Sequence, residues 1–324
     1  MALQLSTKAF SQTQRWHKTA QFGLDLVRHN LPRSSHAGSM IGIRSRLLSC
    51  CPIALANSPH FRVASQSKKH PLGPEFRPKE GEQQIQENDY LLPHPIWSEE
   101  EANNITVTHE KPRDKTEKAA YFSVQLLRFG FDLFSGYWFG SMNENKWLRR
   151  IIFLETVAGV PGMVAAMTRH LHSLRRMRRD YGWIHTLLEE AENERMHLLT
   201  ALHLKRPGPF FRACVILGQG IFVNFFILSY LISPRFCHRF VGYLEEEAVI
   251  TYTKCLNQID RGYLPMWAKM DAPDIARTYW QLKPDAKMRD VILAIRADEA
   301  HHRLVNHTLA SINPEQKNPY KPGE

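Results

Sequence analysis

Cysteine is scarce in this chain of 324 residues, and its spacing is irregular. None of the five cysteines forms a CxxC pair, and three of them (Cys214, Cys237 and Cys255) lie in apolar or helical stretches. A disulfide framework and a structural zinc site are therefore not expected. The composition, 43% apolar and 23% charged, excludes a disordered polymer and a collagen-like fibre and is sufficient for a sizeable folded core.

Acidic residues are nearly absent from residues 1–74. This stretch contains one acid, Asp25, and ten Lys or Arg, for a net charge of +9. This stretch lacks a long apolar run followed by a small-residue cleavage site, so a secretory signal is not expected. Its basic residues are scattered among apolar ones such as Leu5 and Trp16 instead of clustering as in a nucleic-acid-binding arm. We predict an organelle transit peptide and no nucleic-acid partner.

Residues 75–117 have the opposite charge, −6, and five prolines lie between Pro71 and Pro95. This composition indicates an acidic, Pro-rich arm. Alternating strand patterns and solenoid repeats are absent from residues 118–312, which instead show long helical periodicity. The sequence predicts an all-helical domain there and a short tail over 313–324, with helices at Lys118–Phe139, Lys146–Arg178, Trp183–Leu204, Pro209–Ile232, Pro234–Asp260, Ala272–Gln281 and Pro284–Leu309.

Two of these expected helices carry a Glu-x-x-His motif, Glu194 with His197 and Glu299 with His302. Residues three apart share a helix face, so each motif can direct a carboxylate and an imidazole at one point. One such motif alone is typical of a solvated face. Two motifs, each beside apolar neighbours, place acids at or inside a core, where a compensating cation is expected.

A di-iron carboxylate bundle needs one further Glu from each of two other helices. Glu155 is a candidate because it is the only acid between residues 144 and 180 and lies in an apolar run. The second candidate comes from three consecutive acids, of which Glu245 shares a face with apolar residues. Glu246 is interpreted as a surface residue, and Glu247 remains open.

The donor set favours iron. Four glutamates carry −4 and two Fe(II) carry +4, so the reduced site would be neutral and could be buried. Carboxylate and imidazole ligands without thiolate suit iron or manganese, and zinc is the second choice. The predicted cofactor is two iron ions, with these ligands: Glu155, Glu194, His197, Glu245, Glu299 and His302.

Four segments carry a resemblance to a known family: Leu154–Thr156, Asn193–Leu198, Leu244–Ala248 and Arg296–His302. They are similar in order and spacing to the four signature motifs of the mitochondrial alternative oxidases, over roughly residues 100–312. That family oxidises ubiquinol and reduces O2 to water at a di-iron centre, insensitive to cyanide and without proton pumping. The resemblance implies the same six ligands and a ferritin-like four-helix bundle with extra membrane-surface helices.

The resemblance also implies a location and partners. It implies that the transit peptide is mitochondrial and that the protein is a homodimer on the matrix side of the inner membrane, at the lipid surface. Plant members are modulated through a cysteine in the arm, but no cysteine lies between Cys51 and Cys214 here. Thiol-linked control and a covalent dimer are therefore not expected.

Further roles follow from the resemblance alone. Tyr252 matches a tyrosine thought to donate an electron or hydrogen atom when the O–O bond breaks, and a core tyrosine is the alternative. Asn193 and Asp298 match positions that orient the histidines. Trp280 matches another position near the site, although helix packing would explain it equally well.

A set of polar and small residues resembles the quinol or inhibitor pocket. Arg128 and Arg150 are expected to hydrogen-bond the quinone oxygens, and the alternative is pairing with lipid headgroups or with Asp132. The implied pocket comprises Arg128, Asp132, Arg150, Leu154, Ala248 and Thr251.

One segment, residues 213–232, has no charge and is long enough to cross a bilayer. A single crossing would separate the helices of Glu194 and Glu245, which must meet in one bundle. We therefore expect the segment to lie in one leaflet, with Lys118–Phe139 as its partner on the membrane surface. Five arginines lie between these two segments in the sequence. They form one cluster that either meets anionic headgroups or is a solvated face: Arg169, Arg175, Arg176, Arg178 and Arg179.

Three other functions share part of this pattern. A plastid quinol terminal oxidase would share the ligands but have an extra segment before the last ligand helix, which is not seen here. A di-iron hydroxylase of quinone biosynthesis fits the four motifs poorly. A non-enzymatic iron-binding bundle would have no quinol pocket and would tolerate loss of Tyr252.

Overall fold

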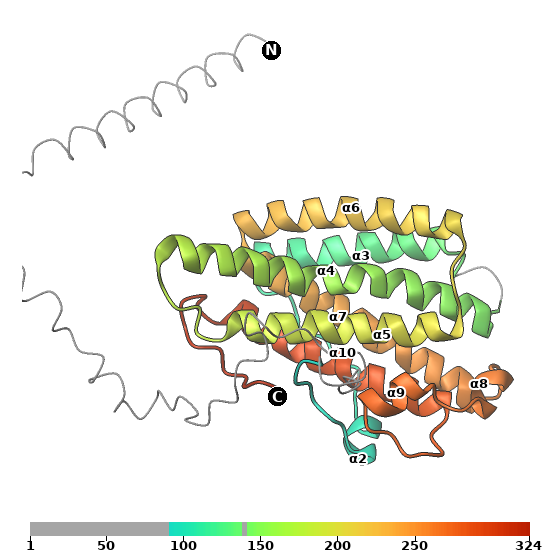
Figure 1. The fold of residues 1–324 in the computed structure, drawn as a ribbon. Helices are drawn as coiled ribbons and strands as arrows, with labels where there is room; N and C mark the ends of the chain where they lie inside the picture. Colours follow the sequence, from blue (N-terminus) through green and yellow to red (C-terminus); the bar gives the residue numbers. More distant parts are fainter. Residues whose placement is uncertain (1–90, 138–140) are drawn as a thin grey trace, which may run out of the picture. The chain divides into compact units, whose positions relative to one another are not determined.

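The computed structural model describes residues 91–137 and 141–324. The predicted transit peptide and the arm before residue 91 lie outside this part. The described ranges are helical and contain no β-strand, which confirms the all-α fold class. Figure 1 shows the helices, which are α2 Glu99–Asn103, α3 Lys115–Phe134, α4 Glu144–Arg176, α5 Trp183–Leu204, α6 Pro209–Ile232, α7 Pro234–Asp260, α8 Pro265–Lys269, α9 Asp274–Tyr279 and α10 Met288–Ser311.

Four long helices form the bundle that carries the predicted metal residues. Helix α10 packs along α7, and α4 packs along α5. Helices α3 and α6 form an outer layer, in which α3 lies on α7 and α6 lies on α4 (Figure 1). The bundle therefore has one side covered by these two helices.

The close approach of α4 to α5 depends on a glycine. A Cβ added at Gly162 would lie 2.6 Å from the Leu187 carbonyl oxygen, closer than carbon and oxygen can approach. Glycine therefore lets the two helices pack tightly enough for Glu155 and Glu194 to face the same interior.

Helix ends differ from the expected bounds where capping residues decide them. The Asp114 side chain accepts a hydrogen bond from the Glu117 N–H, so α3 begins three residues earlier than expected. It ends at Phe134, and Gly136 follows with a φ of 66°. Helix α10 begins at Met288, where the Asp290 side chain accepts a hydrogen bond from the Lys287 N–H at 2.8 Å. The five-residue helices α2 and α8 were missed because they are too short to show periodicity.

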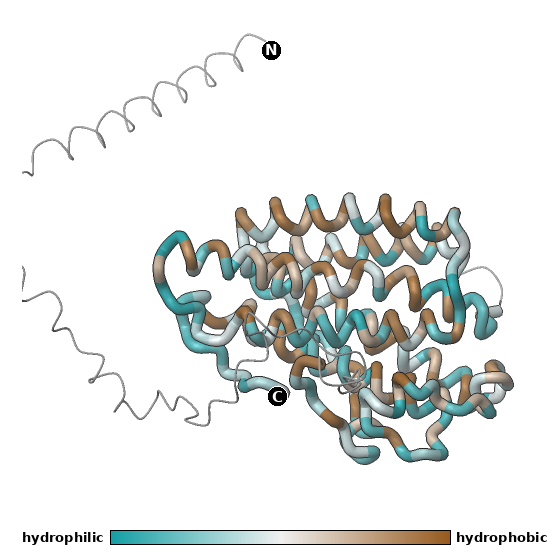
Figure 2. The backbone as a smooth tube through the Cα atoms, viewed as in Figure 1, coloured by the Kyte–Doolittle hydropathy of each residue, from teal (hydrophilic) through white to brown (hydrophobic). Residues whose placement is uncertain are grey.

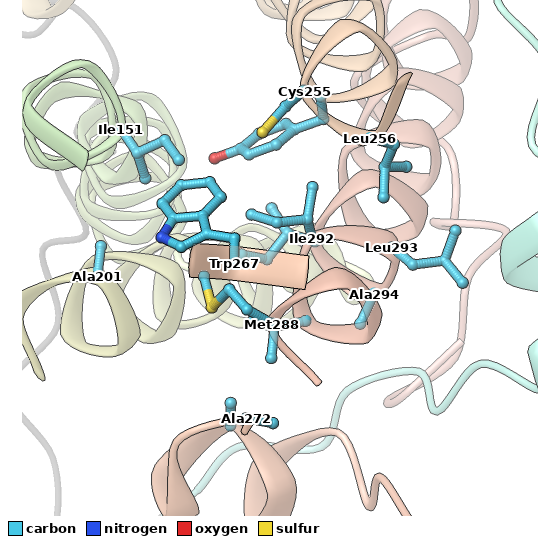
Figure 3. Close-up of a cluster of buried hydrophobic side chains, with 14 of the residues drawn as sticks. Ile151, Ala201, Cys255, Leu256, Trp267, Ala272, Met288, Ile292, Leu293 and Ala294 are labelled. Carbon is cyan, nitrogen blue, oxygen red and sulfur yellow. The ribbon is translucent and has the colours of Figure 1, made fainter. Parts of the chain in front are cut away.

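Side chains from the four bundle helices and from α8 form an apolar cluster (Figure 3). Ile151 of α4, Cys255 of α7, Trp267 of α8 and Ile292 of α10 are each 5% exposed or less. Truncating a buried Ile or Trp to Ala typically costs about 2–5 kcal/mol. This cluster holds the four helices in register beside the predicted metal residues.

The predicted domain boundaries at residues 117 and 312 stay predictions, but both flanking segments contact the bundle. Leu91, Trp97 and Ile105 pack against the cluster of Figure 3. On the carboxyl side, the Trp183 indole donates a hydrogen bond to the Gln316 carbonyl at 2.8 Å. Both segments therefore belong to the packed structure.

Two described helices, α4 and α6, are long and apolar enough to cross a membrane by length and composition. Half of the most apolar window of α4 is buried in the bundle, but only 11% of that of α6 is. Figure 2 shows α6 as a mostly hydrophobic outer helix. Its exposed apolar side chains include Ile216, Leu217, Ile221, Phe225, Leu228, Leu231 and Ile232, and those of α3 include Phe122, Leu126, Phe129 and Leu133.

Candidate metal centre

The structure brings all six predicted metal residues together inside the bundle. Glu155 comes from α4, Glu194 and His197 from α5, Glu245 from α7, and Glu299 and His302 from α10. Each is 5% exposed or less.

Their ligand atoms form two overlapping groups that share two glutamates. In each group one donor atom per residue lies within 4.8 Å of the others. Glu194 and Glu299 belong to both groups, as carboxylates bridging two ions would. The first group adds Glu155 and His197, and the second adds Glu245 and His302. The arrangement therefore suits two neighbouring cations.

Several donor atoms of this cluster have no hydrogen-bond partner outside the cluster, although His302 Nδ1 lies 2.8 Å from a Glu194 oxygen within it. They are Glu155 Oε2, both carboxylate oxygens of Glu194, and the Nδ1 atoms of His197 and His302. Unsatisfied buried polar atoms are rare and costly in native proteins. Their convergence on one interior point fits a bound pair of metal ions.

The protonation equilibria show the same charge imbalance. Burial and the neighbouring Glu194 charge raise the pKa of Glu155 to about 8. Burial and Glu299 raise the pKa of Glu245 well above its usual range. Burial would lower the pKa of His302, but hydrogen bonding to Glu194 outweighs it and raises that pKa to about 9. Protons are thus drawn in where cations would otherwise neutralise the carboxylates.

Asp298 orients His197. The Asp298 Oδ2 atom lies 3.0 Å from His197 Nε2 and accepts hydrogen bonds from Asn193 and Trp280 at 3.0 and 2.8 Å. This interaction directs the other ring nitrogen, Nδ1, toward the oxygens of Glu155, Glu194 and Glu299 at 3.4–3.5 Å. Residues that hold a ligating histidine in this way fix its tautomer and its basicity.

Two members of this network were missed in the sequence. The Trp97 indole donates to Asp298 Oδ1 at 2.5 Å, and the Tyr279 hydroxyl accepts from Asn193 at 3.0 Å. Trp97 lies in the stretch interpreted as an arm, which carries no periodic signal. Only the folded chain shows that it reaches a residue 201 positions away.

Tyr252 lies beside the cluster. It is 4% exposed, and its hydroxyl donates a 2.5 Å hydrogen bond to Glu155 Oε1. Burial, with the nearby carboxylates, raises the pKa of Tyr252 well above its usual range. The phenol therefore keeps its proton and points it at a predicted ligand.

The three consecutive acids of α7 face different surroundings. Glu245 joins the cluster, whereas Glu247 pairs with Arg128 and accepts from Gln125 Nε2 at 2.6 Å, facing α3. The surface interpretation of Glu246 is wrong, because this residue is only 4% exposed. The segment before α3 and helix α10 pack over this face of α7 and bury Glu246.

Glu246 is held by donors on both sides. Its oxygens accept the Glu110 N–H at 2.8 Å and lie 2.7 and 2.9 Å from ring nitrogens of His109 and His307. We call these residues, Glu246, His109, Glu110 and His307, the arm clasp. The clasp ties residues 109–110 to α7 and α10.

The predicted quinol residues lie between α3, α4 and α7. Arg150 is 2.6 Å from Asp132, and its guanidinium stacks over Tyr137 at 4.0 Å. Arg128 is 3.5 Å from Asp132 and also contacts Glu247. Both arginines thus have the acidic partner given above as the alternative. The remaining members are the partly exposed Leu154 and Ala248, and Thr251, whose hydroxyl donates to the Glu247 carbonyl at 2.8 Å.

A second buried acid, Glu190, was also missed. Asn306 donates to Glu190 Oε1 at 2.6 Å and lies 3.2 Å from His238, which in turn contacts the Tyr230 hydroxyl at 3.1 Å. Burial raises the pKa of Glu190 to about 7 and lowers that of His238 to about 4. The available signal was spacing, since Glu190 lies one helical turn before Glu194.

A family model described as Alternative oxidase matches residues 97–311 of this chain. The chain belongs to the alternative oxidase family. The matched range contains all the residues of the candidate metal centre, the arm clasp and the predicted quinol pocket. The resemblance noted from four motifs is thereby confirmed.

Curated relatives agree over most of the sequence. The chain is 53% identical to an alternative oxidase of Emericella nidulans over 249 residues, 71% of this chain and 70% of the relative. It is 51% identical to one of Aspergillus niger over 258 residues, 76% of this chain and 74% of the relative. It is 45% identical to one of Ajellomyces capsulatus over 312 residues, 87% of each. All three are named mitochondrial.

As a member of this family, the protein is an oxidase enzyme, as the motifs predicted. The plastid-type enzyme and the non-enzymatic iron-binding bundle are not favoured. The buried cluster of carboxylates and imidazoles is compatible with a metal site in an enzyme of this family.

Proposed function

We propose that this protein oxidises two ubiquinols and reduces one O2 to two waters, without proton pumping and in the presence of cyanide. The observation that carries the proposal is the buried cluster of four glutamates and two histidines, in which several donor atoms converge without hydrogen-bond partners outside the cluster. Its setting in a chain of this family supports a catalytic, redox-active centre.

Two iron ions are the proposed cofactor. The four carboxylates carry −4, which two Fe(II) balance, and oxygen and imidazole donors suit iron. Bound iron supplies the one-electron redox chemistry with O2 that protein side chains lack. The proposed ligands are the six residues of the cluster, with Asn193, Asp298 and Trp280 as the residues that hold His197 in place.

Tyr252 is the proposed redox-active side chain. Its O–H is already hydrogen-bonded to Glu155, so a hydrogen atom leaving the phenol starts next to a metal ligand. Burial keeps the phenol protonated, which preserves the hydrogen atom until it is needed. No water or exposed group is required for this donation.

The proposed quinol site is the group of predicted residues between α3, α4 and α7. Arg128 lies at its centre, 24% exposed and paired with acids on two helices. A quinol hydroxyl that bonds to these charged groups would lie next to the exposed apolar side chains of α3. Arg128→Gln is expected to raise the KM for ubiquinol while leaving the iron content unchanged.

The proposed location is the matrix-side surface of the mitochondrial inner membrane. Helices α3 and α6 expose apolar side chains along their length, whereas the metal residues of the four bundle helices are buried in the interior. This distribution supports a protein that inserts two helices into one leaflet, as an interfacial protein does.

A non-covalent homodimer is also proposed. Helix α4 exposes Met163, Met167, Leu171 and Leu174 at helical spacing, which forms an apolar stripe that a second copy would cover. Cys237 and Cys255 are buried and Cys214 is partly buried, so none favours an intermolecular disulfide. Sedimentation should give a dimer that reducing agent leaves intact.

The deciding experiment is O2 uptake by purified, iron-loaded protein with ubiquinol and cyanide. We expect turnover in the wild type, none in Glu194→Ala, and near-normal turnover in Glu192→Ala, whose side chain pairs with exposed Arg195 on the same helix. Metal analysis should give two irons per chain. Equal turnover in zinc-loaded protein, or uptake abolished by cyanide, would overturn the proposal.

A further inference from the structure

One surface cavity gathers all five arginines of the cluster noted in the sequence. It measures about 310 Å³ and lies where the carboxyl ends of α4 and α6 meet the start of α7 and the C-terminal segment. Figure 1 shows both of these helix ends at the same end of the bundle. Its charged lining comprises Arg169, Arg175, Arg176, Arg178, Arg179, Asp180 and Glu315. We call it the arginine pocket.

The floor of the arginine pocket is fixed. The Arg169 side chain is 12% exposed, bonds Asp180 at 2.7 Å and the Pro314 carbonyl at 3.0 Å, and stacks over Trp183 at 4.2 Å. Tyr230, at 2% exposure, completes this floor. The cavity is therefore built from packed groups and is more than a set of mobile surface side chains.

The rim of the pocket carries unbalanced positive charge. Both acids of the lining are already paired, Asp180 with Arg169 and Glu315 with Arg176 at 2.9 Å. In the described part of the chain, Arg175, Arg178 and Arg179 have no acidic partner. With histidine neutral, the lining has a net charge of +3, which calls for an anion.

The pocket also borders the apolar outer face. Leu231 belongs to its lining and is 62% exposed, and the neighbouring Ile232 is 84% exposed. Both residues lie at the carboxyl end of the apolar face of α6. A soluble anion would gain nothing from these side chains, whereas an amphiphilic anion would use the arginines and the apolar residues together.

We propose that the arginine pocket binds the headgroup of an anionic phospholipid. The phosphate lies against the guanidinium groups of Arg178 and Arg179, and the acyl chains run over Leu231 and Ile232. A phosphatidylcholine headgroup fits less well, because its ammonium group would approach three unpaired arginines. This inference rests on the membrane-surface placement proposed above, and it assigns one defined lipid site within that surface.

The test uses the purified, iron-loaded protein in neutral detergent micelles, which lack a charged surface. Phosphatidylglycerol is titrated in, and binding is followed by the rise in melting temperature and by lipid bound per chain. We expect saturation at one lipid per chain and little effect of phosphatidylcholine. The pocket variant is R178Q/R179Q, and the control is R206Q/R212Q, which removes the same charge at the opposite end of α6.

The expected result is that the pocket variant raises the Kd for phosphatidylglycerol about tenfold or more, whereas the control changes it less than about twofold. Iron content and quinol oxidation should stay at the wild-type level in both. Equal loss in both variants, equal binding of phosphatidylcholine, or equal protection by free glycerol phosphate would overturn the lipid pocket. The R178K/R179K variant keeps the charge and should retain phosphatidylglycerol binding. It serves as the control for misfolding caused by substitution at these two positions.

A separate measurement keeps the two proposals apart. Wild-type protein should float with pure phosphatidylcholine vesicles through its apolar helices alone. If it does not float with any vesicle, the membrane-surface placement fails. If it floats but phosphatidylglycerol binding in micelles is the same in R178Q/R179Q, only the arginine pocket fails.

Discussion

Adjacent residues of α7 take part in two different clusters of buried charge. Glu245 lies in the candidate metal centre, here called the metal cluster, where several donor atoms lack hydrogen-bond partners outside the cluster and burial raises the pKa of Glu155 to about 8. Glu246 lies in the arm clasp, where hydrogen bonds from His307, Glu110 N–H and His109 outweigh burial and lower its pKa. Both glutamates are 4% exposed or less.

The difference shows which buried acids need a cation from outside the chain. In the arm clasp, the protein supplies donors to both oxygens of Glu246, so the charge is compensated internally. In the metal cluster, four carboxylates face two histidines and each other. Burial alone therefore does not indicate a metal site, and the missing counter-charge does.

The largest effect is expected for Glu245→Ala. This change removes one ligand and leaves the remaining cluster with an uncompensated positive charge when metal is bound. We expect quinol oxidase activity to fall to background and the iron content to drop below two per chain. Full turnover with two irons, measured by O2 uptake and metal analysis on one preparation, would remove Glu245 from the ligand set.

Tyr252→Phe should separate redox chemistry from metal binding in the same cluster. The change deletes only the hydroxyl, so both irons and quinol binding should persist while turnover collapses. A purely structural tyrosine would instead lose about 0.5–1.5 kcal/mol of stability and keep its activity. Iron content, melting temperature and cyanide-insensitive turnover distinguish the two, and retained turnover would end the redox assignment.

Asp298→Asn should weaken the metal cluster without removing a ligand. Asn keeps the shape but loses the charge that holds His197 Nε2, so the other ring nitrogen is directed less firmly at the metal. Such changes typically cost about 10- to 100-fold in metal affinity or activity. The loss of metal affinity is measured as iron retention during dialysis against a chelator, with Glu192→Gln as the matched control. Unchanged retention would contradict the orienting role.

The smallest effect on activity is expected in the arm clasp. Glu246→Gln should lower the free energy of unfolding by about 1–3 kcal/mol, because charge-assisted hydrogen bonds to His109 and His307 are lost. Iron content and turnover should stay near wild type. Denaturant unfolding measures the free energy, and metal analysis and O2 uptake measure iron content and turnover. Loss of iron in this variant would mean that the two clusters of α7 are one functional unit.

Much of the site was predictable because four of the six proposed ligands follow a simple spacing rule and the other two lie beside apolar residues. Two Glu-x-x-His motifs and a Glu isolated in an apolar run, Glu155, indicate inward-facing donors on helices. The choice of Glu245 over Glu246 rested on apolar neighbours and agrees with the structure's groups of donor atoms. The surface interpretation of Glu246 failed because its neighbours come from elsewhere in the chain.

The sequence by itself determined the helical fold class, the order of the long helices and the family, because periodicity and motif spacing are local properties. Tertiary structure decided which partners each buried charge has. It brought Trp97 to Asp298, placed His109 against Glu246, and left the oxygens of Glu194 without donors outside the metal cluster. The physical reason is that counter-charge and desolvation depend on contacts between distant segments, which no local pattern encodes.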